Sequence, residues 1–174
     1  MLETPRLILR GMNQQSYDDL FQNHSDSEIK TILGISEDSE LETEKSRYQG
    51  GYSTFNITIQ VFQLVLKEDM RIIGNCGFHS WAKQHRRAEV FYSLKNDLDK
   101  RNGYMSEALN EVLKYGIEIM NLRRIEGFVA VTNPASYLLL EKFGFKQEAK
   151  LKHRYLFDDG EEWDYFYSFL TENN

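Results

Sequence analysis

Alternating apolar and polar positions predict the strands in the first half of this chain. The runs that show this alternation are Arg6–Arg10, Thr58–Leu66, Arg71–Ser80 and Arg87–Leu94. The polar segment Lys67-Glu68-Asp69 separates the second run from the third, so we expect a turn there and an antiparallel strand on each side.

Apolar residues with helical spacing predict the longest helix at Tyr104–Met120. Two shorter helices are expected at Ser16–Asn23 and Asp38–Gln49, and the second is charged enough to lie on the surface. A strand at Arg124–Val131 follows the long helix. The connection to it from Leu94 is long enough to join two parallel strands.

The segment from Asn133 to Phe145 predicts a short helix with both ends specified. Asn133 suits the N-cap, because its side-chain oxygen can accept a hydrogen bond from a free backbone N–H. Pro134 fits the first helical position, and Gly144 can take the left-handed conformation just beyond the end. Because a strand leads straight into Asn133, the helix begins where open α/β sheets bind ligands.

The last predicted element is a hairpin with strands Lys152–Phe157 and Trp163–Leu170 around the turn Asp158-Asp159-Gly160. With only two prolines and no low-complexity segment, the chain shows no sign of a linker, so we expect one domain over residues 1–174. The order of elements predicts an α+β fold, in which a mixed and mostly antiparallel sheet carries helices on both faces.

Composition narrows the possible functions. The net charge of −6 argues against a broad nucleic-acid surface, and no apolar run is long enough to span a membrane. The N-terminus lacks the order of a signal peptide, and the single cysteine, Cys76, fits a reducing compartment, so we expect a cytoplasmic protein. The histidines lack metal-ligand spacing, and we expect no metal site.

The loop Lys100–Tyr104, just before the long helix, has features of an anion site. Gly103 allows close backbone approach, and the first N–H groups of a helix favour negative charge. Lys100 and Arg101 add positive charge in a chain that is acidic overall, which fits a ligand bearing phosphate. Taken alone, the loop is more simply interpreted as an ordinary solvated connection.

Together these segments resemble the GNAT acyltransferases, which use acetyl-CoA, and more narrowly their RimJ/RimL branch, which acetylates protein N-terminal amines. The similarity runs from Thr4–Arg10 to the final hairpin. The segments that carry it are Thr4–Arg10, Ala88–Tyr92, Arg101–Leu109, Arg123–Glu126, Asn133–Ser136, Gly160 and Asp164. Each motif is weak alone, but their order and spacing are specific.

The resemblance implies a sheet that splays between Arg87–Leu94 and Arg124–Val131, with the pantetheine arm of acetyl-CoA in the gap. Asn133 would bond this arm, and Lys142 would reach the ribose phosphate. The other residues expected to bind acetyl-CoA are Tyr92, Ser93 and Leu94 on the strand, and Arg101, Asn102, Gly103, Tyr104, Met105 and Ser106 in the pyrophosphate loop. The expected partners are acetyl-CoA and an amine acceptor, and the chain would be a monomer or a homodimer.

The sequence departs from the family pattern at three places. Arg101 stands where the loop usually has glycine, and it would either block the phosphate or contribute a guanidinium. Phe91 also replaces a frequent glycine. Leu140 stands where many relatives have a tyrosine that protonates the leaving thiolate, so Ser136 becomes the expected proton donor.

Acetyl transfer to an amine needs a base, a stabilised oxyanion and a proton for the thiolate. Glu89, beside the gap, is the candidate base through a water, although a salt-bridged strand carboxylate is the alternative. For Ser136 the alternative is a serine that only bonds the first helical turn. A backbone N–H near Tyr92 would hold the oxyanion.

Two functions remain in competition at this point. The first is an N-acetyltransferase that acts on a protein α-amine or a small amine by direct transfer. The second is a non-catalytic module of the same fold that binds CoA or a partner, and the departures at Arg101 and Leu140 motivate it.

Overall fold

The computed structural model describes residues 1–51, 57–152 and 163–170. These residues form one eight-stranded sheet with the strand order β1-β2-β3-β4-β5-β6-β8-β7. Its strands are β1 (Leu2–Glu3), β2 (Leu7–Asn13), β3 (Ile57–Leu66), β4 (Ile72–Ala82), β5 (Arg87–Leu94), β6 (Arg124–Ala130), β7 (Lys146–Lys152) and β8 (Trp163–Leu170). Neighbouring strands are antiparallel except β5 and β6, which the α4 crossover makes parallel. The expected mixed, mostly antiparallel sheet is therefore confirmed.

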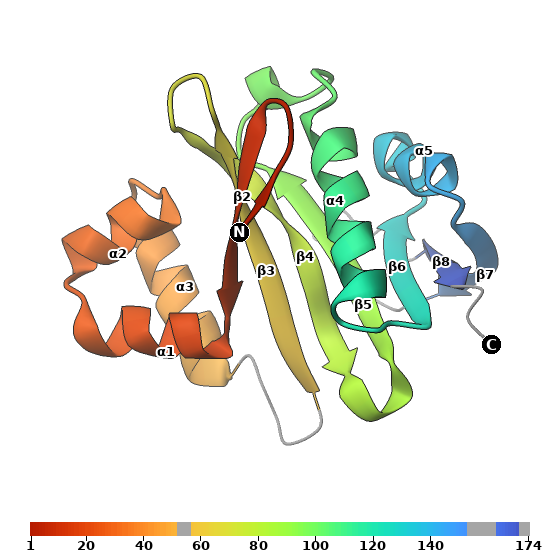
Figure 1. The fold of residues 1–174 in the computed structure, drawn as a ribbon, viewed down its shortest axis with the longest axis horizontal. Helices are drawn as coiled ribbons and strands as arrows, with labels where there is room; N and C mark the ends of the chain where they lie inside the picture. Colours follow the sequence, from red (N-terminus) through yellow and green to blue (C-terminus); the bar gives the residue numbers. More distant parts are fainter. Residues whose placement is uncertain (52–56, 153–162, 171–174) are drawn as a thin grey trace.

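Helices cover both faces of the sheet. The helices are α1 (Gln14–Asn23), α2 (Asp26–Leu33), α3 (Asp38–Gly50), α4 (Tyr104–Glu118) and α5 (Pro134–Lys142). In Figure 1, α1–α3 gather beside β2 and β3, whereas α4 crosses the sheet over β4 and β5. None of the helices in the described residues is both long and apolar enough to cross a membrane.

Strand alternation divides the core into two clusters, one on each face. On β3, Phe62 and Leu64 pack in the cluster that contains α4, whereas Ile59 and Val61 pack in the cluster under α1–α3. Cys76 lies in the first cluster and is fully buried, and burial raises the pKa of its thiol. It is therefore a small, buried and unreactive side chain.

The parallel pair β5–β6 separates soon after it begins. Its register runs only from Arg87 opposite Arg124 to Glu89 opposite Glu126. Beyond Glu89 the two strands part, and the five remaining residues of β5, positions 90–94, stay paired only with β4. This is the expected splay, and it opens a gap that side chains from β5, β6 and α5 line.

Two elements differ from the sequence-based predictions. The first strand of the final hairpin is β7 at Lys146–Lys152, so the prediction of Lys152–Phe157 began too late, and residues 153–162, with the predicted turn, lie outside the described part. β7 is an edge strand with a mostly exposed polar sequence, so it lacks the alternation that a buried face produces. Helix α2 was not predicted, although Ser25 and Glu28 form its capping box.

Candidate active site

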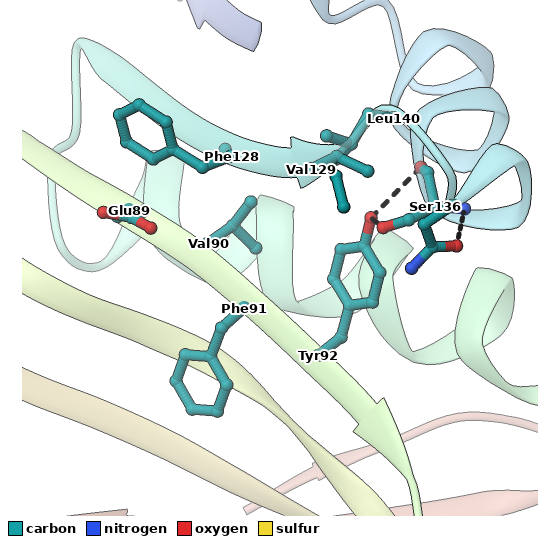
Figure 2. A pocket seen from close by; sticks show the side chains of 11 residues that line it. Glu89, Val90, Phe91, Tyr92, Phe128, Val129, Ser136 and Leu140 are labelled. Atoms are coloured by element: carbon teal, nitrogen blue, oxygen red, sulfur yellow. Dashed lines mark hydrogen bonds between the residues drawn. The ribbon is translucent and has the colours of Figure 1, made fainter. Parts of the chain in front are cut away.

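A cavity of about 390 Å³ occupies the gap between β5 and β6 (Figure 2). β5 contributes Glu89–Tyr92, β6 contributes 127–130, and the start of α5 contributes Asn133, Ser136 and Leu140. The cavity exists because the two strands stop pairing at Glu89, while α5 begins just after the end of β6. The site is therefore at the carboxyl end of two parallel strands, where helix N-termini and loops converge.

The start of α5 has the predicted cap. The Asn133 Oδ1 atom accepts a hydrogen bond from the backbone N–H of Ser136 at 3.1 Å, and Pro134 occupies the first turn. At the other end, Gly144 has a φ of +83°, in the left-handed region that favours glycine. Both ends are fixed locally, so Ser136 is held at the mouth of the gap.

The side chain of Tyr92 reaches across the gap to Ser136. Its hydroxyl lies 2.7 Å from the Ser136 hydroxyl and donates to the Ser136 carbonyl at 3.2 Å (Figure 2). Burial raises the pKa of Tyr92 to about 12, so the phenol keeps its proton at neutral pH. From the sequence, Tyr92 was expected to contribute only its backbone to the site. Leu140, which stands where many relatives have a tyrosine, is 1% exposed and belongs to the core. A tyrosine therefore does stand beside Ser136, but it comes from β5.

Glu89 projects from the opposite face of β5 and contacts His79 of β4. Its carboxylate Oε1 lies 3.3 Å from the His79 Nε2 atom, and the His79 ring packs on Phe91 at a centroid distance of 5.6 Å. Glu89 is 8% exposed, so its carboxylate is held in a partly desolvated position at the edge of the cavity. The sequence could not reveal this contact, because it depends on the register between β4 and β5.

A second carboxylate, Glu126, stands beside Glu89 in the parallel register of β5 and β6. Arg87 bonds one of its oxygens at 2.5 Å, and Arg124 bonds the other at 2.7 Å. Its charge is thus balanced by two guanidinium groups, which leaves Glu89 as the carboxylate that lines the gap.

A larger cavity of about 590 Å³ continues from the gap along the loop before α4. The two cavities share Tyr92, Asn133 and Ser136. The predicted cofactor residues that line the larger cavity are Tyr92, Ser93, Leu94, Arg101, Gly103, Tyr104, Met105, Ser106 and Asn133. The structure thus brings together segments that are distant in the sequence into one elongated, connected space.

Loop geometry explains the role of glycine before α4. Gly103 caps the helix with a φ of +81°, and Arg101 has a φ of +63°, a conformation in which a side chain is strained. The glycine expected at position 101 from the family pattern would adopt this conformation without that strain. Arg101 adopts this conformation all the same, and it lines the larger cavity.

Two predicted cofactor residues lie outside the lining of both cavities. Asn102 donates from its side chain to the Leu98 carbonyl at 2.9 Å, and its own carbonyl accepts from Arg6 at 3.0 Å. Lys142 donates to the Ser106 hydroxyl at 2.8 Å and so links the end of α5 to the start of α4. Lys142 and Ser106 both line a smaller neighbouring cavity, whereas Asn102 has an observed role within its own loop.

The opening motif Thr4–Arg6 has a structural role beside this loop. Arg6 donates to Glu107 of α4 from its Nε atom at 2.7 Å and from its backbone N–H at 2.9 Å, and the Thr4 hydroxyl bonds the same carboxylate. Although burial opposes its charge, these bonds hold the pKa of Glu107 below its usual value. The N-terminal segment therefore anchors the start of α4.

No metal-binding group is visible in the described ranges. A search there for three or more clustered His, Cys, Asp and Glu side chains finds none.

Comparison with known proteins identifies the family. Residues 6–146 match the family model described as the acetyltransferase (GNAT) domain. The chain is 33% identical over 165 residues to the uncharacterized N-acetyltransferase YoaA of Bacillus subtilis. This alignment covers 94% of this chain and 92% of YoaA. It is 25% identical over 175 residues to YnaD, another uncharacterized N-acetyltransferase of the same organism, at 98% and 97% coverage.

Solved structures share the fold. An acetyltransferase (GNAT family) from Bacillus anthracis superposes with a TM-score of 0.68 at 24% identity over 99% of both chains. The spermidine/spermine N-acetyltransferase SpeG from Vibrio cholerae gives a TM-score of 0.71 at 20% identity, with 95% of this chain and 92% of that chain covered.

The class defined by the splayed sheet and the capped helix at its gap is that of the acyltransferases that use acetyl-CoA. This chain belongs to the GNAT acetyltransferase family, and it is an N-acetyltransferase.

Proposed function

We propose that this enzyme transfers the acetyl group of acetyl-CoA directly to the α-amine of a protein N-terminus, as the RimJ/RimL branch does. The observation that carries the proposal is the continuous space formed by two cavities, with Tyr92 and Ser136 where they meet and Glu89 at the far edge. One cavity would hold the cofactor arm, and the other would bring the amine to it.

The proposed binding of acetyl-CoA follows the larger cavity. The backbone of Tyr92–Leu94 would bond the pantetheine arm, because this part of β5 is no longer paired with β6. The amides of 101–106 and the dipole of α4 would bind the pyrophosphate. Asn133 would bond the arm, and Lys142, beside Ser106, would reach the ribose phosphate.

Two groups on opposite sides of β5 would then handle the protons. Glu89 would take a proton from the ammonium form of the acceptor through a water, and the neutral nitrogen would attack the thioester carbonyl. A backbone N–H near Tyr92 would hold the oxyanion. When the C–S bond breaks, the Ser136 hydroxyl would give its proton to the sulfur. Tyr92, protonated and 2.7 Å away, would hold the Ser136 hydroxyl in place and replace its proton. The attacking nitrogen would release its second proton to water, and Tyr92 would regain from water the proton that it gave.

An α-amine is the acceptor that this site would need to assist least. Its pKa is about 8, so a useful fraction is neutral near pH 7, whereas a lysine or polyamine nitrogen has a pKa near 10.4. A polyamine is a second candidate, because the solved fold neighbours include spermidine N-acetyltransferases. The similarity to them, at 20–21% identity, shows the fold alone.

Calorimetric titration with acetyl-CoA, followed by an amine panel, tests the proposal. The panel contains a peptide with a free α-amine, the same peptide with a blocked α-amine and one lysine, and spermidine, and the released thiol is measured. We expect binding and preferential turnover of the free α-amine. Absence of acetyl-CoA binding at millimolar ligand would contradict the function, and binding without turnover of any amine would favour the non-catalytic alternative.

Two substitutions test the proposed roles. We expect Ser136→Ala to lower kcat about a hundredfold and Glu89→Gln to do the same. Ser46→Ala and Glu118→Gln change exposed helical residues outside the cavities and are the matched controls. If the two site variants have the same kcat as these controls, the roles assigned to Ser136 and Glu89 are wrong, even if the enzyme acetylates the proposed acceptor.

A further inference from the structure

A groove beneath α3 has a mostly polar lining, to which Tyr17, Leu33 and Ile35 add apolar side chains. It encloses about 300 Å³ on the sheet face that carries Glu89 and Phe91. Residues 40, 43, 44 and 47 of α3 line its roof, and their spacing puts them on one face of the helix. They are Glu40, Thr43, Glu44 and Arg47. The only buried residue of α3 is Leu41.

The floor of the groove is polar across three adjacent strands. Gln63 of β3 pairs in register with Asn75 of β4, and Asn75 pairs with Ser93 of β5. All three side chains therefore project to the same face in one row. Two residues away on the same face, Val61 and Phe91 pack in the apolar cluster, so the polar row is a local feature.

The charged groups around the groove already have partners. Glu44 pairs with Arg47 at 2.5 Å, and the Lys95 ammonium donates to the Leu33 carbonyl at 3.0 Å. Glu40 accepts from the backbone N–H of Ser36 at 3.2 Å. With two carboxylates and two cations balanced, the groove offers little net attraction to a charged ligand.

Gln63 offers a free acceptor in the floor. Its side-chain nitrogen donates to the Ile32 carbonyl at 2.9 Å, whereas its Oε1 atom has no hydrogen-bond partner within the described residues. Gln63 is 2% exposed and less than 1 Å² of this oxygen is accessible, so it is a buried acceptor that a ligand N–H or O–H would satisfy once the amide turns toward the groove. The groove thus favours an uncharged group with a hydrogen-bond donor.

The groove lies in line with the reaction site. Ser93 lines both the groove and the larger cavity, and Glu89 is four residues earlier on the same face of β5. At ~3.3 Å per strand residue, Glu89 is roughly 13 Å from Ser93, which is the length of about four residues of an extended peptide.

We propose that this groove binds the backbone amide near the fourth residue of a peptide whose α-amine is acetylated. The inference rests on the proposed function and specifies its acceptor: a peptide of at least four residues, with no charge required at the fourth. A cationic tail, such as that of a polyamine, would gain little from carboxylates that are already paired.

Alanine peptide amides of two to five residues test this inference. With saturating acetyl-CoA, we expect kcat/KM for the peptide to rise about tenfold from the dipeptide to the tetrapeptide and then to level off. A tenfold rise is the size of effect expected from one or two added hydrogen bonds. Gln63→Met keeps the side-chain length but removes the acceptor, and it should reduce this length dependence to about twofold. Asn75→Ala serves as a second variant if Gln63→Met does not fold.

Gln22→Met is the control, because it removes an amide on α1 that bonds Tyr48 outside the groove. It should keep the tenfold dependence on length. Three outcomes would overturn the inference while leaving acetyl transfer intact. The rate could be independent of peptide length, the dependence on length could persist in both groove variants, or the enzyme could acetylate small amines alone. Lack of acetyl-CoA binding would instead remove the proposed function itself.

Discussion

At the scale of single residues, the contact between Tyr92 and Ser136 matters most for the chemistry. The absence of tyrosine at position 140 pointed to Ser136 as a lone donor, but the structure gives this serine a half-buried phenol as a neighbour at 2.7 Å. With its pKa raised to about 12 by burial, Tyr92 keeps its proton near neutral pH and is not a base there, and its hydroxyl can donate to the Ser136 hydroxyl or accept from it.

Tyr92→Phe tests this interpretation because it removes only the phenolic oxygen. We expect kcat to fall about tenfold, which corresponds to a lost hydrogen bond of roughly 1.4 kcal/mol, while KM for acetyl-CoA changes little. In a double-mutant cycle, Tyr92→Phe should add almost nothing to Ser136→Ala, since both act through one proton path. Fully additive effects on kcat would show that Tyr92 acts independently of Ser136.

At the scale of elements, the site depends on how closely α4 packs on β4. A Cβ atom at Gly116 of α4 would lie 2.6 Å from the ring of Phe78, which is fully buried and cannot move aside. The glycine thus sets the depth of the helix on the sheet, and with it the position of the loop at its N-terminus.

Gly116→Ala should therefore destabilise the protein. Overpacking costs about 1–3 kcal/mol, which exceeds or cancels the gain of about 1 kcal/mol in helix propensity. Gly50→Ala at the end of α3 is the matched control, since a Cβ there meets nothing within 4 Å and should be neutral or stabilising. Urea unfolding of both variants gives the comparison, and a stabilised Gly116→Ala would mean that α4 packs less tightly than the structure shows.

At the scale of the whole molecule, acetyl-CoA should add contacts between the parts of the chain on the two sides of the splay. The larger cavity is formed by β5, the loop before α4, and α5, so one ligand would bridge both sides of the splay. We also propose that residues 1–174 unfold as one domain. The C-terminal strands belong to the same sheet as the other strands, because β8 lies between β6 and β7.

Thermal unfolding tests both expectations. At a concentration of 100 times its Kd, acetyl-CoA should stabilise the protein by about 2.7 kcal/mol and raise Tm in a single transition. Asn133→Ala should lower Tm by the loss of the cap, which costs about 1 kcal/mol, and should also reduce the shift caused by acetyl-CoA. Two separate transitions would contradict the single domain, and an unchanged Tm would contradict the binding site.

Features that depend on neighbouring residues could be predicted from the sequence. The alternation in β2, β3 and β5, the spacing of α4 and both caps of α5 are local patterns, because they report which face is buried and how a helix begins and ends. The order of the motifs also pointed to the family. Edge strand β7 has no buried face that would produce alternation, and its position could not be predicted from the pattern.

The side chains that meet in the site could not be predicted from local patterns, because their contacts depend on long-range packing. The pairing of Tyr92 with Ser136, the contact of Glu89 with His79 and the polar row from Gln63 to Ser93 all join elements far apart in the chain. Each depends on strand register and on the crossover through α4, and a one-residue slip would turn every side chain of a strand to its other face. Local pattern therefore specified the elements, and long-range packing specified the site.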